Sequence, residues 1–160
     1  MDGNAEAEVE KQESNVAFVM LGGEERYRQQ ARDLGIKNVF FIDFVASVEK
    51  IHEFLSTLNV FTHGRSDGEV CSAAIIEALY HGLPVISHPG WNNGHMGQIK
   101  DCGVWCQNIP DYTTAMLIFK RRPETYKIVV DKTNFVYERD YKFDTVVGKI
   151  NKIIDNLIGG

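Results

Sequence analysis

The chain has 160 residues, the length of a single domain with one sizeable core. Its hydrophobic and charged fractions, 44% and 24%, are ordinary for a globular protein, and no apolar run approaches the ~20 residues that cross a membrane. The net charge is −5, of which five acids and one lysine before residue 15 supply −4. The remainder is therefore near neutral, which argues against a nucleic-acid backbone as partner.

The first 14 residues are polar and acidic and contain no aromatic residue. We expect a disordered tail or linker over 1–14, with a short helix that folds back as the alternative, and one folded domain over 15–160. The start has neither the basic beginning nor the apolar centre of a secretory signal. Three cysteines are an odd number, so we expect reduced thiols and a cytoplasmic protein.

Strands and helices are predicted to alternate along the rest of the chain. The run 16–21 is continuously apolar, which indicates a strand buried on both faces, as in a parallel sheet. Further strands are predicted at 38–42, 60–62, 85–86 and 103–105. Helices are predicted at 24–34, 47–58, 72–81, 111–120, 123–136 and 145–158. This order predicts an α/β fold, a Rossmann-like open parallel sheet of about five strands with helices on both faces.

The most informative stretch is 62–86, which contains a strand end, a polar loop, a short helix and a second strand. Ser72 is the predicted N-cap of the helix, and Gly82 is the predicted left-handed stop. Glu69 lies in the loop and Glu77 in the helix. If helical geometry held throughout, roughly 80° and roughly 12 Å would separate them. That separation suits the two ends of an elongated ligand, and it is too large for a shared proton or one small metal.

Backbone amides lie between these two acids. The N–H groups of Val70, Cys71 and Ser72 open the helix and have no acceptor within it. With the helix dipole they form a predicted anion site, for which phosphate is the usual occupant. A sugar, a diphosphate and a ribose would then meet an acid, the amides and a second acid in that order. The alternative is that Glu77 is an ordinary solvated acid.

The segment GEVCSAAIIEALYHGLPVI resembles a known signature: Glu, seven residues, Glu, then a small-Gly-x-Pro-Val strand entry. It is the signature of retaining glycosyltransferases of the GT-B fold, family-4 type (glycosyltransferase group 1). The resemblance implies that Glu77 binds the ribose of a nucleotide-sugar, that Glu69 is the catalytic candidate beside the donor sugar, and that the amides after it hold the diphosphate. The family usually has Gly-Phe-Gly where this chain has 70–72, and side chains there are expected to crowd the diphosphate.

The resemblance covers about residues 16–155, with KNVFFIDFV similar to the family's strand that ends beside the base. In open parallel sheets ligands bind beyond the carboxyl ends of the strands, so the loops that follow the strands should gather there. The further donor-binding residues expected at this edge are Gly22, Gly23, Phe44, Val45 and Arg65.

The segment GHMGQI, residues 94–99, resembles the family's Gly-Gly-x-Pro-Glu-Ile turn, with Gln98 where Glu is usual. Glycine there lets the backbone approach a ligand closely, and the alternative is a surface loop without function. Cys102 and Cys106, with His95 nearby, are weak evidence for a metal. The resemblance implies a nucleoside diphosphate sugar as substrate, with no cofactor and no metal.

In full enzymes of the family, this half begins with a further strand and helix whose Arg and Lys clamp the diphosphate, and an acceptor-binding half precedes it. Neither is recognisable before residue 16, although Arg26, Arg65 and His63 are candidate cations. We therefore expect the donor-binding C-terminal half of a GT-B enzyme, which needs an N-terminal acceptor-binding domain or a partner chain. The isolated chain is expected to bind donor without turnover and, through its open strand edge, to self-associate.

Two other functions stay open from the sequence. One is a nucleotide or nucleotide-sugar binding module without catalysis, and the other is a flavodoxin-like regulatory domain in which Glu69 and Glu77 are incidental. The likeness of folds cannot separate the enzyme from the binding module. Hydrolysis is less favoured, because no pair of carboxylates at glycosidase spacing is evident.

Overall fold

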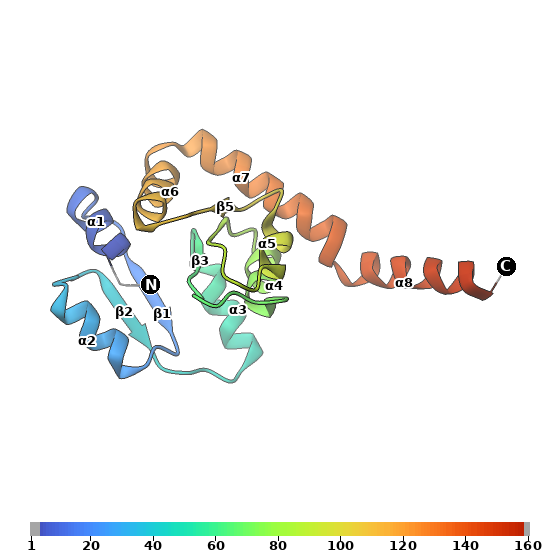
Figure 1. Cartoon of the computed structure of the whole chain (residues 1–160), viewed down its shortest axis with the longest axis horizontal. Coiled ribbons are helices and arrows are strands. Elements are labelled where there is room, and N and C mark those ends of the chain that lie inside the picture. The colour runs from blue at the N-terminus through green and yellow to red at the C-terminus, as the bar shows by residue number, and fades with distance from the viewer. Residues whose placement is uncertain (1–3, 159–160) are drawn as a thin grey trace.

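The computed structural model describes residues 4–158, and strands and helices alternate through most of its length (Figure 1). The strands are β1 Phe18–Leu21, β2 Val39–Ile42, β3 Phe61–His63, β4 Val85–Ser87 and β5 Val104–Trp105. The helices are α1 Asn4–Gln12, α2 Glu25–Asp33, α3 Val48–Ser56, α4 Ala73–Tyr80, α5 Gly94–Ile99, α6 Ile109–Arg121, α7 Pro123–Val136, the π-helical turn η1 Tyr137–Tyr141, and α8 Phe143–Ile158. The predicted α/β class is confirmed.

All strand pairs are parallel. β1 pairs with β2, and β4 pairs with β3 on one side and β5 on the other. Within residues 4–158 no ladder joins β1 or β2 to the other three strands, so the expected single sheet of about five strands is instead a pair and a three-stranded sheet. In doubly wound sheets the first strand lies between the second and the fourth. If β1 corresponds to the second strand of such a sheet and β3 to the fourth, the gap between the β1–β2 pair and the three-stranded sheet lies at the position of the first strand.

The boundaries of α4 follow from its sequence. Ser72 caps the helix, its hydroxyl accepting the N–H of Ile75 at 3.4 Å. Gly82 has φ of +68°, the left-handed geometry that ends a helix with least strain in glycine, and Pro84 cannot continue it. The helix predicted over 72–81 is confirmed to within one residue at each end.

The core lies on both sides of the three-stranded sheet. One cluster packs α4 against α3, α5 and α7, around Ile75, Leu79 and Val85. The other packs α6 and α1 around Ile86 and Tyr112. All of β4 is buried, which matches a central strand between two covered faces.

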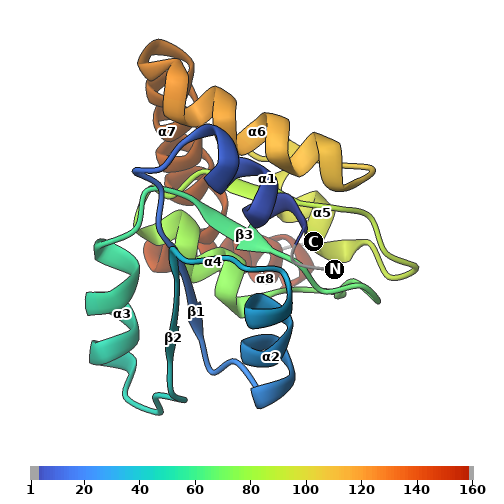
Figure 2. The ribbon, with the colours of Figure 1, turned by 90° about the vertical axis from the view of Figure 1, so that its left-hand side faces the viewer.

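The N-terminal segment is a correction to the sequence analysis. Residues 4–12 form α1 rather than a disordered tail or linker, and residues 1–3 of that prediction lie outside the described residues. Ala5 and Val9, one helical turn apart, are buried at 2% and 1% exposure, and α1 lies along α6 (Figure 2). The carboxylate of Glu10 accepts the backbone N–H groups of Lys37 and Asn38 at 2.6–3.1 Å. The acidic composition favoured disorder, whereas the structure has the alternative, a short helix with one narrow apolar face.

The β1–β2 pair is covered less than predicted. β1 was expected to be buried on both faces, yet Val19 and Met20 are 37% and 36% exposed. Phe40 on β2 is 57% exposed. Burial on both faces requires covering elements as well as apolar residues, and this pair lacks a full cover.

Helix α8 leaves the body of the molecule and extends to the C-terminal end (Figure 1). It contains no buried residue, and three of its apolar side chains, Phe143, Ile153 and Leu157, are more than half exposed. No helix among the described residues combines the length and the apolar character needed to cross a bilayer.

Candidate functional site

Glu69 follows β3 and lies between two basic side chains. Its Oε1 accepts from Nη1 of Arg65 at 2.8 Å, and its Oε2 lies 3.5 Å from Nε2 of His63. Burial by itself raises the pKa of Glu69, but hydrogen bonds with Ser72 and Arg65 and the charges of His63 and Arg65 outweigh it. The net pKa lies below the ordinary value, so the carboxylate is ionised at neutral pH.

The three candidate cations differ in what they offer. Burial lowers the pKa of His63 despite the nearby Glu69 charge, so this ring is neutral at neutral pH and does not supply the expected positive charge. Arg26 on α2 pairs with Glu24 at 3.0 Å. Arg65 keeps its charge, but its Nε also donates to Asp67 at 2.8 Å. Arg65 is therefore the expected cation that the structure brings to Glu69.

The amides at the start of α4 are arranged differently from the prediction. No acceptor within residues 4–158 takes the N–H groups of Val70, Cys71, Ala73 or Ala74. The Ser72 N–H was expected to have no acceptor, but it donates to Oε1 of Gln98 on α5 at 2.7 Å. The anion site thus loses one expected amide and gains two from the first turn of the helix.

Helix α5 and the loop before it close against the Glu69 loop. The backbone of Gly68, in the left-handed region at φ +71°, bridges to Asn92. A Cβ on Gly94 would overlap the carbonyl oxygen of Val70. These positions admit only glycine because two backbones meet there, so the segment that resembles the family's turn packs directly on the loop with Glu69.

Two side chains of α5 make contacts that the sequence analysis did not foresee. His95 is fully buried, and its Nδ1 lies 3.2 Å from both the backbone nitrogen and the backbone oxygen of Glu69. Gln98, 6% exposed, binds the Ser72 backbone through both ends of its amide. The available signal was two polar residues three positions apart in an otherwise apolar and glycine-rich segment.

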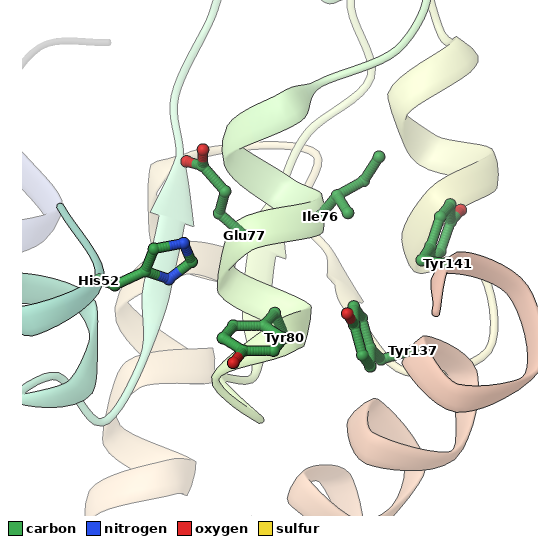
Figure 3. A pocket seen from close by; sticks show the side chains of 6 residues that line it. All are labelled: His52, Ile76, Glu77, Tyr80, Tyr137 and Tyr141. Atoms are coloured by element: carbon green, nitrogen blue, oxygen red, sulfur yellow. The ribbon is translucent and has the colours of Figure 1, made fainter. Parts of the chain in front are cut away.

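Glu77 lies in a different hollow from Glu69. It borders an open cavity of about 280 Å³ that is lined by His52, Ile76, Glu77, Tyr80, Tyr137 and Tyr141 (Figure 3). Figure 3 shows Glu77 and His52 on one side of α4 and the two tyrosines of η1 on the other. The aromatic lining was not predicted, because it joins α3, α4 and η1, which are distant in sequence. Glu77 is half-buried, rather than a fully solvated acid.

His52 is held on this cavity wall by a second histidine. Its Nδ1 lies 2.7 Å from Nε2 of His81, the residue that ends α4, and its ring meets Tyr80 edge-on at 5.2 Å between centroids. Burial and the neighbouring His52 both lower the pKa of His81. One ring must therefore donate and the other accept, which ties α3 to the C-terminal end of α4.

The residues expected at the ends of β1 and β2 form a group of their own. Gly22 has φ of +73°, and a Cβ there would lie 3.9 Å from the ring of Phe44. Gly23 fits closely against Met20, Phe44 is 82% exposed, and Val45 is half-buried. Within residues 4–158 no hydrogen bond or ion pair connects this group to the Glu69 loop.

The cysteines are placed apart. Cys102 belongs to the cluster beneath α4 and Cys106 to the cluster beneath α6, and burial raises the pKa of each to about 11. In the part of the chain that the structure describes, no three His, Cys, Asp or Glu side chains are grouped to hold a metal ion. Cys71 is exposed beside the amides.

Comparison with known proteins shows the family and the fold of the chain. The sequence profile of the family described as Glycosyl transferases group 1 matches residues 4–113, more than half of the chain. No curated protein matches the chain closely enough to count as a relative.

Solved structures share the fold at low sequence identity. Anabaena HepE in complex with UDP-glucose aligns with a TM-score of 0.77 and 17% identity, over 96% of this chain and 44% of HepE. WaaG, a glycosyltransferase involved in lipopolysaccharide biosynthesis, aligns with a TM-score of 0.75 and 18% identity, over 99% of this chain and 43% of WaaG. The C-terminal domain of LpcC, a glycosyl transferase group 1 protein from Francisella tularensis, aligns with a TM-score of 0.69 and 16% identity, over 89% of this chain and 80% of that domain. The chain thus spans less than half the length of HepE and WaaG.

Proposed function

Because the chain belongs to the Glycosyl transferases group 1 family, we propose that it is the donor-binding half of a retaining glycosyltransferase. It binds a nucleoside diphosphate sugar, from which the complete enzyme transfers the sugar to an acceptor. One observation carries the proposal: an ionised carboxylate, Glu69, directly precedes backbone amides that residues 4–158 leave without acceptors. The complex of HepE with UDP-glucose makes uridine nucleotides the first probes to use.

The amides and the helix dipole bind the diphosphate. During sugar transfer negative charge grows on the leaving diphosphate, so fixed N–H groups that point at it lower the barrier. Those of Val70, Cys71, Ala73 and Ala74 serve this purpose. Arg65, already 2.8 Å from Glu69, adds a positive charge that can turn from its carboxylate partners to the phosphates.

Glu69 acts as an anion. Its lowered pKa means that it cannot donate a proton at neutral pH, so it stabilises positive charge on the donor sugar or accepts a hydrogen bond from a sugar hydroxyl. Neutral His63 at 3.5 Å supports the carboxylate without neutralising it. This role makes Glu69 the catalytic residue of the proposal.

Glu77 binds the ribose. A half-buried carboxylate beside an open cavity can accept the hydrogen bonds of two neighbouring hydroxyls, and the aromatic wall favours a flat or apolar ligand face. Gly22, Gly23, Phe44 and Val45 remain our candidates for the other wall of the donor site. We expect no cofactor and no metal in this reaction, and a cytoplasmic protein.

The acceptor side comes from elsewhere. We propose that an N-terminal acceptor-binding domain or a partner chain supplies it, in keeping with a chain that spans 44% of HepE. The isolated chain then binds donor without transferring sugar.

The proposal is tested by titrating the chain with UDP, UDP-glucose and uridine in a calorimeter. We expect UDP and UDP-glucose to bind, and uridine to bind more weakly by at least about tenfold, because the amides contribute charge-assisted hydrogen bonds to phosphate. If neither UDP nor any other nucleoside diphosphate from a GDP, ADP and CDP panel binds, the donor-binding role is wrong.

A matched pair of glycines on α5 sharpens the test. Gly94→Ala places a methyl group against the Val70 carbonyl and should lower UDP affinity by about tenfold or more, since the two loops must separate. Gly97→Ala has no atom within 4 Å of the added carbon and should leave UDP affinity unchanged. Equal affinities of the two variants would show that the junction of these loops has no part in donor binding.

A further inference from the structure

The loop of residues 69–72, here called the donor loop, is held at both ends by buried side chains of one short helix. His95 reaches the peptide groups of Glu69 at its first residue, and Gln98 reaches the peptide groups of Ser72 at its last. These side chains are three positions apart on α5, so they lie on the same face of the helix. A loop beside a ligand would ordinarily be mobile, whereas the donor loop is held by hydrogen bonds to α5.

The direction of each bond follows from the groups present. Nε2 of His95 lies 3.1 Å from the carbonyl of His88, which can only accept, so Nε2 carries the proton. In the neutral ring Nδ1 then accepts, and the Glu69 N–H at 3.2 Å donates to it. The backbone N–H of His95 donates to the Glu69 carbonyl at 2.9 Å, so both polar groups of the Glu69 backbone bind residue 95.

At the other end an amide is required. Oε1 of Gln98 accepts the Ser72 N–H at 2.7 Å, while Nε2 donates to the Ser72 carbonyl at 3.1 Å and to Sγ of Cys71 at 3.5 Å. A carboxylate at 98 would keep the first bond but would set an oxygen against the Ser72 carbonyl. It would also place a negative charge beside the amides that are to bind an anion.

We propose that His95 and Gln98 are positioning residues of the donor site. They fix the donor loop so that the amides of Val70 and Cys71 stay open to the diphosphate, while the Ser72 amide is withheld from it. This inference rests on the proposed function for its ligand. The hydrogen bonds of His95 to Glu69 and of Gln98 to Ser72, here called the two brackets, are present without ligand. The brackets affect only the binding of the diphosphate, so the affinity for a nucleoside without phosphate does not depend on them.

The brackets are tested first without ligand, by hydrogen exchange of the Ser72 amide. In the wild-type chain we expect a scalar coupling across the hydrogen bond between the Ser72 nitrogen and the side-chain carbonyl carbon of Gln98. Gln98→Leu should speed exchange of the Ser72 amide by at least about tenfold, and Gln98→Glu should restore protection because a carboxylate accepts the same bond. Absence of the coupling, or equal exchange in the wild-type and Gln98→Leu chains, overturns the proposal.

The second arm measures binding of UDP and of uridine. Gln98→Leu and Gln98→Glu should each weaken UDP binding by about tenfold, the first by releasing the loop and the second by adding negative charge, with uridine binding unchanged. Gln107→Leu, at an exposed glutamine before α6, is the control and should bind UDP as the wild-type chain does. Unchanged UDP affinity in both Gln98 variants overturns the role in the donor site. A wild-type chain that binds no nucleoside diphosphate contradicts the proposed function instead, and the exchange experiment still decides whether the bracket exists.

Discussion

The three-stranded sheet and the β1–β2 pair are both parallel and both rich in apolar residues, yet only the first is properly covered. Val85, Ile86 and Ser87 of β4 have no exposure, whereas Phe40 of β2 is 57% exposed. Helices α4 and α6 lie against opposite faces of the first region, and α1 adds to the second of these layers. The donor loop therefore follows a strand whose sheet is covered on both faces. The residues proposed as the second wall of the donor site follow β1 and β2, in a region whose apolar side chains are partly exposed.

The difference has a physical consequence for function. Open strand edges and uncovered apolar side chains favour association, and a region with few buried contacts opens more readily. The β1–β2 pair is therefore the region that changes most when a further domain, strand or chain covers it. The loop with Glu69 does not depend on that cover, because α5 holds it from within the chain.

The largest effect should come from one substitution made in both regions. Val85→Ala removes two methyl groups from a fully buried site and should lower the free energy of unfolding by about 2–3 kcal/mol. Val19→Ala, at 37% exposure on β1, should cost under about 1 kcal/mol. Urea unfolding measures both. Equal losses would break the comparison, since they would mean that β1 is as fully packed in solution as β4.

The next effect concerns the ligand. Glu77→Ala should weaken UDP binding by at least about tenfold, because a charge-assisted bond to a ribose hydroxyl contributes roughly 1.5–3 kcal/mol. The melting temperature should hardly change, since the side chain makes no hydrogen bond within residues 4–158. Glu53→Ala on α3, also an acid of a helix in this region, is the control. Unchanged UDP affinity of Glu77→Ala in calorimetry removes Glu77 from the site.

Local signals in the sequence were sufficient for α4 but not for the helix α5, whose residues 94–99 were expected as a turn or surface loop. Ser72, Gly82 and Pro84 define α4 through capping and backbone geometry, which act within a few residues. The burial of Ala5 and Val9 was missed because it arises only where α1 meets α6, about a hundred residues later in the chain. The exposure of β1 was missed for the converse reason: an apolar run predicts what a strand can bury, and its neighbours decide what it does bury.

The same reasoning applies to the site. Glu69 and Glu77 were found because their spacing is local. The pairing of Gln98 with Ser72, 26 positions apart, depends on how β4 brings α5 back over the donor loop. Arg65 was one of three candidate cations, and only the burial around His63 shows that this ring stays neutral.

A smaller effect is a dependence of stability on pH. His63 has a folded pKa below the ordinary 6.5, so the unfolded chain takes up a proton more readily. The stability that depends on neutral His63 is fully present above about pH 6.5. It is lost as the pH falls from there through the lowered pKa of the folded state. Urea midpoints between pH 8 and pH 5 should show this loss.

The His63→Asn variant should reduce the slope without removing it. His81 and His88 also have lowered pKa values, chiefly through burial, and they lose stability over the same range. The Glu69 carboxylate, whose pKa is below 4.5, contributes only in more acid solution. A slope between pH 6.5 and pH 5 that is identical in the wild-type and His63→Asn chains would mean that His63 is solvated rather than buried.

The smallest expected change in stability tests the open surface itself. Phe40→Thr keeps a residue that favours strands but removes an aromatic ring that is 57% exposed, so it should alter the free energy of unfolding by under about 0.5 kcal/mol. If the β1–β2 pair is where chains associate, the variant should sediment as monomer at concentrations where the wild-type chain forms dimers or larger species. Phe135→Thr, at 62% exposure on α7, removes an equally exposed ring from another surface and should leave association unchanged.

Deletion of residues 1–14 should increase association, because it removes α1 from the core around Ile86 and Tyr112 and exposes a second apolar surface. A wild-type chain and a deletion that both stay monomeric at high concentration would show that the exposed ring of Phe40 is tolerated in water, and that the two regions differ in packing alone.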